Sequence, residues 1–340
     1  MSSPVNNISS APPPRRHRSR GLFSVVLLLA WFAALGLVAL NRHNITDWWK
    51  LQQYHPPDTI AALTVQDTMT PYARKLFYIN QPQIDNKTVF SKNCPNNGGE
   101  QTIVLGCYRG GQSGIFLLEV DEPRLDGVTQ VTAAHEMLHA AYERLSSAER
   151  KKVDGMLVDY NNSGLLDARV QKTVAAYKKS EPKDVINEMH SIFGTEVANL
   201  PAELEAYYKR YFDNRARVVS YAAQYQAEFT NRQIIVAQYD AQLRYLKRQI
   251  ETGQDELQVK QGEIDSMQDR LLAQKNDGDT AGYNAGIPAY NNLVNAYNAQ
   301  VQDIRGLLSE YNRLVEKRNA VALEEDRLVK ELKSDAAPMR

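Results

Sequence analysis

The sequence predicts an α+β fold: a small domain of mixed helices and strands, preceded by one transmembrane helix and followed by a long α-helical coiled-coil hairpin. Three observations lead to this prediction. Residues 21–40 form a run of twenty residues without a charge. Segments with helical and strand-like patterns are mixed over residues 59–214, and apolar residues recur at heptad spacing within residues 215–335. A chain of 340 residues has room for about two domains of ordinary size.

The N-terminal 40 residues are expected to be a tail and a membrane anchor. Residues 1–20 are rich in Ser, Asn and Pro and carry four arginines, with too little apolar material to fold, so we predict a disordered basic tail. At helical rise, residues 21–40 span roughly 30 Å, about the hydrocarbon thickness of a bilayer. Basic residues are denser before this run than after it, which predicts a cytoplasmic N-terminus and an extracytoplasmic C-terminal part. Residues 41–58, ending in Pro56-Pro57, would be a juxtamembrane stalk.

Two alternatives stay open for the apolar run. A cleaved signal peptide usually has an apolar core of about 7–15 residues and a small-x-small cleavage site, and "LVALN" matches that site poorly. A buried helix of a globular domain is the second alternative, but nothing polar interrupts the apolar surface. We favour an uncleaved anchor, and therefore a single-pass membrane protein.

The mixed region contains two strand-like segments and both cysteines. "QTIVLGCY" and "GIFLLEV" are typical of strands, and the glycines of the intervening "RGGQS" suit a hairpin. Outside the cytoplasm, Cys94 and Cys107 would form a disulfide that closes the loop between them. Two buried free thiols are the alternative, and we favour the disulfide.

The C-terminal region carries two heptad stretches separated by a turn. From Val236 onward apolar residues alternate at spacings of three and four, and only Gly253 and Lys260 interrupt the stripe. Glycines and a proline within residues 276–288 end the first helix, after which the pattern resumes. Two such helices most simply fold back as an antiparallel hairpin, with a parallel oligomeric coiled coil as the alternative. A protein partner for this coiled coil is a further expectation.

The segment "VTAAHEMLHAA" carries the chemistry. His135 and His139 are four residues apart, so on a helix both imidazoles can bind one Zn²⁺ at roughly 2.0–2.1 Å. Glu136 reaches beside the metal, where a bound water sits, and can take the proton of that water as it attacks a carbonyl carbon. This is the logic of the HExxH motif. Satisfied core histidines on a buried helix are the alternative.

On these residues, and on the strand-then-helix order, the chain resembles the zincin superfamily of metallopeptidases over roughly residues 60–215. The resemblance implies a mixed sheet behind the HExxH helix, an edge strand that pairs with an extended substrate, and zinc-dependent peptide hydrolysis with Glu136 as general base. Tyr142 and Leu145 stand where metzincins have a glycine and a third histidine. The chain is therefore closer to the gluzincins, in which a glutamate on a later helix completes the site.

Glu188 is the candidate third zinc ligand. It lies at the edge of an apolar helical stripe, where a carboxylate is costly unless it meets a cation. The pair Asn187-Glu188 is similar to the third-ligand segment of several gluzincins. Glu196 and His190 stay open as alternative third ligands. If His190 is not a ligand, we expect it to contact a zinc ligand or to polarise the scissile carbonyl group.

Two further expectations concern the surroundings of this site. Tyr177 is a candidate oxyanion donor, although a packed tyrosine is favoured. Gluzincins often have an acidic residue soon after the third ligand, and here positions 191 and 192 are Ser and Ile, so nothing on the sequence fills that role.

The function expected from the sequence is a membrane-anchored extracytoplasmic zinc metallopeptidase that cleaves a protein or peptide substrate. The alternative is a non-catalytic, membrane-tethered coiled-coil scaffold with a degenerate zincin domain. Forty basic and forty acidic residues cancel, and the sequence contains no phosphate-binding glycine loop or basic nucleic-acid patch. We therefore expect no nucleic-acid partner.

Overall fold

The computed structural model describes residues 19–40, 42–95, 104–180 and 182–333. The chain divides into two compact units, Met1–His55 and Pro56–Arg340. The first unit contains helices α1 (Ser19–Leu40) and α2 (Arg42–Gln53). Most of the predicted tail, residues 1–18, lies outside the described residues, and α2 occupies much of the predicted stalk.

The prediction of a transmembrane helix over residues 21–40 is wrong. A membrane span requires about 20 predominantly apolar residues in one helix. Among the helices that the structure describes, none combines sufficient length with sufficient apolar character to cross a bilayer. The predicted single-pass membrane localisation is corrected with it.

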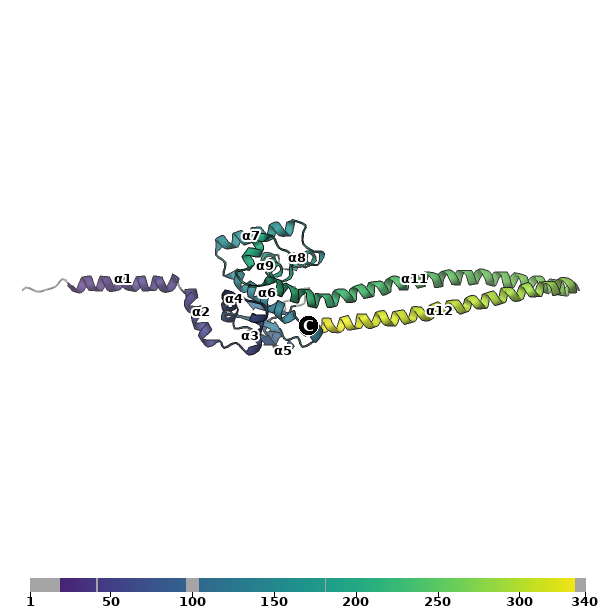
Figure 1. The fold of residues 1–340 in the computed structure, drawn as a ribbon, viewed down its shortest axis with the longest axis horizontal. Helices are drawn as coiled ribbons and strands as arrows, with labels where there is room; N and C mark the ends of the chain where they lie inside the picture. Colours follow the sequence, from purple (N-terminus) through teal and green to yellow (C-terminus); the bar gives the residue numbers. More distant parts are fainter. Residues whose placement is uncertain (1–18, 41, 96–103, 181, 334–340) are drawn as a thin grey trace, which may run out of the picture. The chain divides into compact units, whose positions relative to one another are not determined.

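The second unit consists of a globular part and a helical hairpin (Figure 1). The elements of the globular part are α3 (Asp58–Gln66), α4 (Pro71–Ile79), β1 (Gln83–Asp85), α5 (Lys87–Asn93), β2 (Gly106–Arg109), β3 (Gly114–Leu118), a 3₁₀ turn η1 (Pro123–Leu125), α6 (Val128–Glu143), α7 (Ser147–Asn162), α8 (Ala168–Ser180), α9 (Val185–Glu196) and α10 (Ala202–Tyr208). The hairpin consists of α11 (Arg215–Asn276) and α12 (Thr280–Leu332).

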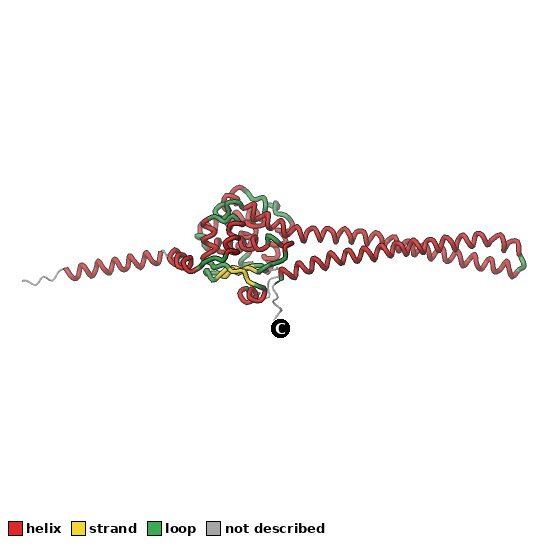
Figure 2. Tube along the Cα trace, turned by 60° about the horizontal axis from the view of Figure 1, so that its bottom comes forward, coloured by secondary structure: helices red, strands yellow, loops and turns green. Residues whose placement is uncertain are grey.

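The sheet has three short strands in the order β1-β3-β2 (Figure 2, yellow). β1 is parallel to β3, and β2 is antiparallel to β3, with Gly106 opposite Leu117. Residues 101–103 of the predicted first strand lie outside the described part of the chain. A disulfide joins Cys94, at the end of α5, to Cys107 of β2, as expected.

The α+β fold class is wrong, because the structure is 78% helical and the described residues form a single sheet of three strands. The strands span three to five residues each. The chain between the last strand, β3, and the hairpin is mainly helical, with α6 to α10. Local signals explain these helices: Ser146 and Glu149, for example, form a reciprocal capping box that starts α7. Helices rather than a broad sheet therefore surround the HExxH segment.

α6 is the central helix of the globular part, in contact with α3, α4, α9, α11, β2 and β3. Its inner faces carry small apolar residues, and Ala133, Ala134, Ala140 and Ala141 are all buried. Small side chains allow neighbouring helices to approach closely, and this close packing holds α6 rigidly.

α11 and α12 pack against each other as an antiparallel pair (Figure 1). Residues of the seam that are buried include Leu246, Ile250, Ile264, Leu271 and Ile304. The turn is shorter than predicted, at residues 277–279, because the Asp279 side chain accepts a hydrogen bond from the Gly282 N–H (2.9 Å) and starts α12 there. Pro288 is inside α12.

The two interruptions of the heptad pattern have distinct partners on α12. A Cβ at Gly253 would lie 3.0 Å from Ile304 Cγ1, so the glycine accommodates a large neighbour. Lys260 donates a hydrogen bond to the side-chain oxygen of Gln300. The Gln300 amide in turn donates to the Gly253 carbonyl oxygen (3.2 Å) and to Glu256 (2.6 Å). This polar layer favours one register of the two helices.

Asp67, at the end of α3, predicts a pH-dependent stability. Its side chain is 0% exposed, and neither carboxylate oxygen has a hydrogen-bond partner among the described residues. Burial raises the pKa of this carboxyl well above its ordinary value of 3.8. The folded protein therefore keeps Asp67 protonated where the unfolded chain is already ionised, so stability is lost as the pH rises above 3.8.

We expect Asp67→Asn to raise the melting temperature at pH 7 and to have almost no effect at pH 3, where Asp67 is protonated in both states. Each pH unit between the unfolded and folded pKa values corresponds to at most about 1.4 kcal/mol. The measurement is thermal unfolding of both proteins at several pH values between 3 and 8. Asp58→Asn on the exposed start of the same helix is the control, and an equal effect of Asp67→Asn at pH 3 and pH 7 would contradict the explanation.

Candidate metal centre

α6 presents the HExxH residues to a cleft. The helix follows Gly127, which has a left-handed backbone (φ 97°). A Cβ at this glycine would be 2.9 Å from the carbonyl oxygen of Tyr221 in α11, so the close crossing requires a glycine. Within α6, His139 and Glu136 are buried at 8% and 5% exposure.

α9 brings the candidate third ligand to the two histidines. It packs directly against α6, and Gly194 makes this packing possible. A Cβ at Gly194 would be 2.4 Å from Leu138 Cδ1 on α6 and 2.7 Å from Tyr208 Cε1 on α10. This tight contact between the helices places Glu188, six residues before Gly194 on α9, beside His135 and His139.

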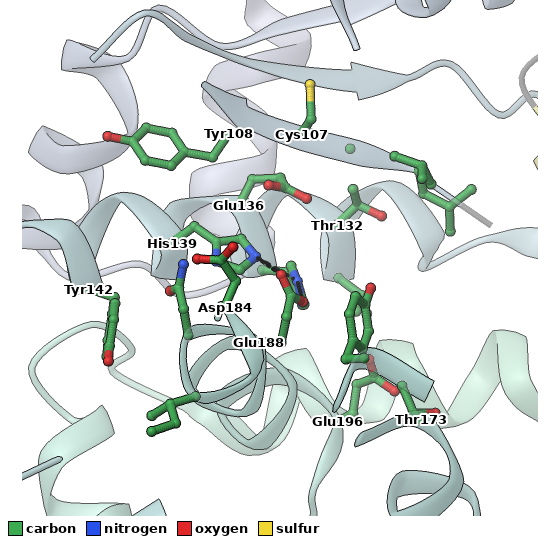
Figure 3. A pocket seen from close by; sticks show the side chains of 18 of the residues that line it. Cys107, Tyr108, Thr132, Glu136, His139, Tyr142, Thr173, Asp184, Glu188 and Glu196 are labelled. Carbon is green, nitrogen blue, oxygen red and sulfur yellow. Dashed lines mark hydrogen bonds and ion pairs between the residues drawn. The ribbon is translucent and has the colours of Figure 1, made fainter. Parts of the chain in front are cut away.

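The three predicted ligands converge on one point. Two of them, His139 and Glu188, are labelled close together in Figure 3. The Nε2 atoms of His135 and His139 are 3.0 Å apart. Glu188 Oε2 is 3.6 Å from His135 Nε2, and Glu188 Oε1 is 3.4 Å from His139 Nε2. Ligand atoms at about 2.0–2.1 Å from a tetrahedral zinc ion lie about 3.3 Å from one another. The observed separations are therefore close to those of a three-ligand zinc site.

The electrostatics of this group also favour a cation. Burial by itself raises the pKa of Glu188, but the imidazoles of His139 and His135, whose Nε2 atoms lie 3.4 Å and 3.6 Å from its oxygens, outweigh it, so the pKa is lowered. Glu188 is thus held as a carboxylate. Its Oε2 atom and the Nδ1 atom of His139 are buried without a hydrogen-bond partner among the described residues. A divalent cation between the two Nε2 atoms would satisfy the carboxylate oxygen that the protein leaves unpaired.

Glu136 lies on the side of α6 that faces β2 (Figure 3). A Cβ at Gly106 of β2 would be 2.9 Å from Glu136 Oε1 and 2.5 Å from Thr132 Cγ2. Any side chain at position 106 would therefore displace the carboxylate. The glycine allows the β2 backbone to pass directly over the HExxH helix.

A cleft of about 900 Å³ surrounds the three ligands and Glu136. β2 and the residues before it form one wall, α6 forms the floor, and α7, α8, α9 and Tyr225 of α11 complete the lining. Within the described residues β2 pairs with β3 only, so its second edge is free. A cleft of this size can hold several residues of an extended peptide.

The alternative third ligands have other partners. Glu196 lines the cleft but forms an ion pair with Arg169 (2.6 Å) and accepts a hydrogen bond from Gln226 (2.9 Å). His190 is fully buried, and its Nε2 atom is 2.8 Å from the Tyr207 hydroxyl. Burial, with the nearby charges of His139 and His135, lowers the pKa of His190 to about 3, so this ring is neutral.

His190 therefore lies behind the site and not in the cleft. Its ring contacts four tyrosines, which are Tyr142, Tyr207, Tyr208 and Tyr211. The Tyr208 hydroxyl also donates to the carbonyl oxygen of His190 (2.6 Å), which anchors α9 close to Glu188. Tyr177, the predicted oxyanion donor, does line the cleft.

Glu143 and Tyr225 are among the cleft residues that were not predicted from the sequence. Glu143 accepts hydrogen bonds from the Tyr108 hydroxyl (2.6 Å) and from the Gly111 N–H (3.1 Å), and thereby ties the end of α6 to the β2–β3 turn. Its spacing of four residues from His139 was a usable signal, because it places Glu143 on the same helix face. Tyr225 had no such signal, since it reaches the cleft from the hairpin.

Gly194→Ala is expected to weaken zinc binding and to destabilise the protein by about 1–3 kcal/mol, because the new methyl group forces α9 away from α6 and carries Glu188 with it. Chelator competition and thermal unfolding measure the two effects. Gly155→Ala on the exposed face of α7 is the control, since its Cβ meets nothing within 4 Å and a helical alanine is favourable. Equal zinc affinity in both variants would contradict this role of Gly194.

Comparison of the chain with protein-family models, with curated proteins and with solved structures gives no match. The assignment of a function therefore rests on the geometry of the site.

Proposed function

We propose that the protein is a zinc-dependent metallopeptidase that hydrolyses peptide bonds in an extended protein or peptide substrate. The observation that carries the proposal is the convergence of His135, His139 and Glu188, with Glu136 on the adjacent wall of the same cleft. Two histidines and one carboxylate are the protein ligands of many catalytic zinc sites, which keep a fourth position for water. A bound zinc ion would polarise that water and the scissile carbonyl group.

The chain's own residues would perform the remaining steps. Glu136 accepts a proton from the attacking water and delivers it to the leaving amine. The products are an N-terminal fragment with a new carboxyl group and a C-terminal fragment with a new amino group. The edge of β2 that has no strand partner among the described residues can hydrogen-bond to an extended substrate, as the resemblance to zincins implies. Tyr177 is placed on the cleft lining as a candidate donor to the developing oxyanion.

Metal analysis and a hydrolysis assay on the full chain test the proposal. We expect about one zinc ion per chain, cleavage of an unfolded protein such as casein, loss of cleavage with a chelator and recovery with zinc. Absence of bound metal in protein purified without chelator would refute it. Bound zinc without cleavage of casein or of a mixed peptide library would instead favour the non-catalytic scaffold.

A further inference from the structure

The base of α11 contacts both helices that carry the candidate ligands. Arg215, the first residue of α11, is 5% exposed and donates hydrogen bonds to the carbonyl oxygens of Val197 (2.6 Å) and Ala198 (3.0 Å), just beyond α9. One to two turns later, the Tyr221 carbonyl lies against Gly127 at the start of α6. α11 is therefore fixed to the end of α9 and to the start of α6.

The returning end of α12 packs onto the same start of α6. Leu328 and Leu332 are 0% and 4% exposed and form a buried cluster with Leu125 and Val128. Val128 is the first residue of α6 and precedes His135 by seven residues, about 10 Å along the helix. The last turns of the hairpin thus cover the beginning of the HExxH helix.

Leu105 and Tyr225 connect this buried cluster to the cleft. Leu105, just before β2, and Tyr225 of α11 are partly buried and pack against the cluster. Both also line the cleft that contains the ligands. Leu328 and Leu332 therefore support one part of the cleft wall from behind, so a displacement of α12 removes that support.

The polar contacts that hold the end of α12 lie near the surface. Glu324 pairs with Arg124 and lies 3.7 Å from Arg232, and Lys87 contacts Glu331 at 3.3 Å. Surface ion pairs contribute little to stability, so the two leucines carry most of the docking.

We propose that docking of the end of α12 regulates the zinc site. In the docked state Leu105 and Tyr225 hold the cleft wall so that a substrate lies correctly beside Glu136. Release of Leu328 and Leu332 loosens this wall and the first turns of α6, and it lowers turnover without loss of the metal, because the three ligands lie outside the cluster. A ligand of the hairpin would change activity by shifting this docking equilibrium. This inference rests on the proposed function.

The test compares the full chain with Leu328→Ala/Leu332→Ala and with the control Leu308→Ala/Leu323→Ala, whose leucines on the same helix are 40% and 61% exposed. For the first variant we expect a fall in kcat/KM of about 10- to 100-fold, since small misplacements near a reacting group have effects of that size. Zinc content should remain at about one ion per chain. Hydrogen exchange should accelerate in residues 104–109 and 128–134. The control should match the wild type in all three measurements.

A milder pair covers the case in which the double variant fails to fold. Leu332→Ala alone removes one of the two docked leucines (4% exposed) and should lower kcat/KM in the same direction by a smaller factor, whereas its control Leu323→Ala (61% exposed) should leave kcat/KM unchanged. Two results for Leu328→Ala/Leu332→Ala would overturn the regulatory role. One is a kcat/KM and a rate of hydrogen exchange equal to those of the wild type, and the other is loss of the bound zinc. Both results leave the proposed function standing. If the wild type binds zinc but cleaves nothing, the proposed function fails, and hydrogen exchange alone decides the coupling.

Discussion

Replacement of Glu136 by Gln is expected to abolish detectable peptide hydrolysis while about one zinc ion per chain stays bound. The amide keeps the size of the side chain in the narrow space beside Gly106, but it cannot accept the proton of the attacking water. Loss of a general base lowers turnover by about 10²–10⁴-fold. The measurements are kcat/KM on a fluorogenic peptide and zinc content by mass spectrometry.

Glu143→Gln is the matched control for this prediction. Glu143 lies on the same helix and lines the same cleft, but its carboxylate is engaged by Tyr108 and Gly111. We expect its turnover to fall less than about tenfold, since it lacks a role in proton transfer. If Glu136→Gln retains the wild-type rate, Glu136 is not the base and the proposed mechanism is wrong.

Replacement of Glu188 by Gln is expected to lower the affinity for zinc by at least about 100-fold, and activity with it. Changes to groups that merely support a ligand already lower metal affinity 10- to 100-fold, so removal of a ligand charge should have at least the larger effect. Competition with a zinc chelator of known affinity measures the loss, and circular dichroism shows whether the variant keeps the overall helical content of the wild type.

Glu196→Gln on the same helix provides the comparison. Its carboxylate pairs with Arg169 and Gln226, so we expect zinc affinity close to that of the wild type. The opposite pattern, in which Glu196→Gln loses zinc and Glu188→Gln retains it, would move the third ligand to Glu196. Equal retention in both variants would remove the carboxylate from the metal site altogether.

The candidate site was more predictable from the sequence than the fold. The spacing of His135 and His139 fixes their common face as soon as the segment is helical, and the cost of a carboxylate on an apolar stripe pointed to Glu188. Both arguments depend on local rules. The choice between Glu188 and Glu196 could not be made in this way, because it depends on how Arg169 and Gln226 pair across helices.

The predicted fold class failed for a related reason. Short apolar runs such as "GIFLLEV" identify strands, but they do not say how many strands share a sheet, and three do so in the described part of the chain. The membrane assignment also failed, since the absence of charge over residues 21–40 was the main observation behind it. The role of Tyr225 follows from the crossing of α11 over α6, which no local pattern encodes.

The disulfide between Cys94 and Cys107 has a practical consequence for biochemistry on this protein. Cys107 lies between Gly106, whose missing side chain leaves room for Glu136, and Tyr108, whose hydroxyl donates a hydrogen bond to Glu143. Dithiothreitol in a storage buffer would reduce this disulfide beside the proposed general base, and its thiols would compete for a metal ion bound at the candidate site. Samples purified with and without such a reductant should therefore be treated as two different reagents when their specific activities are compared.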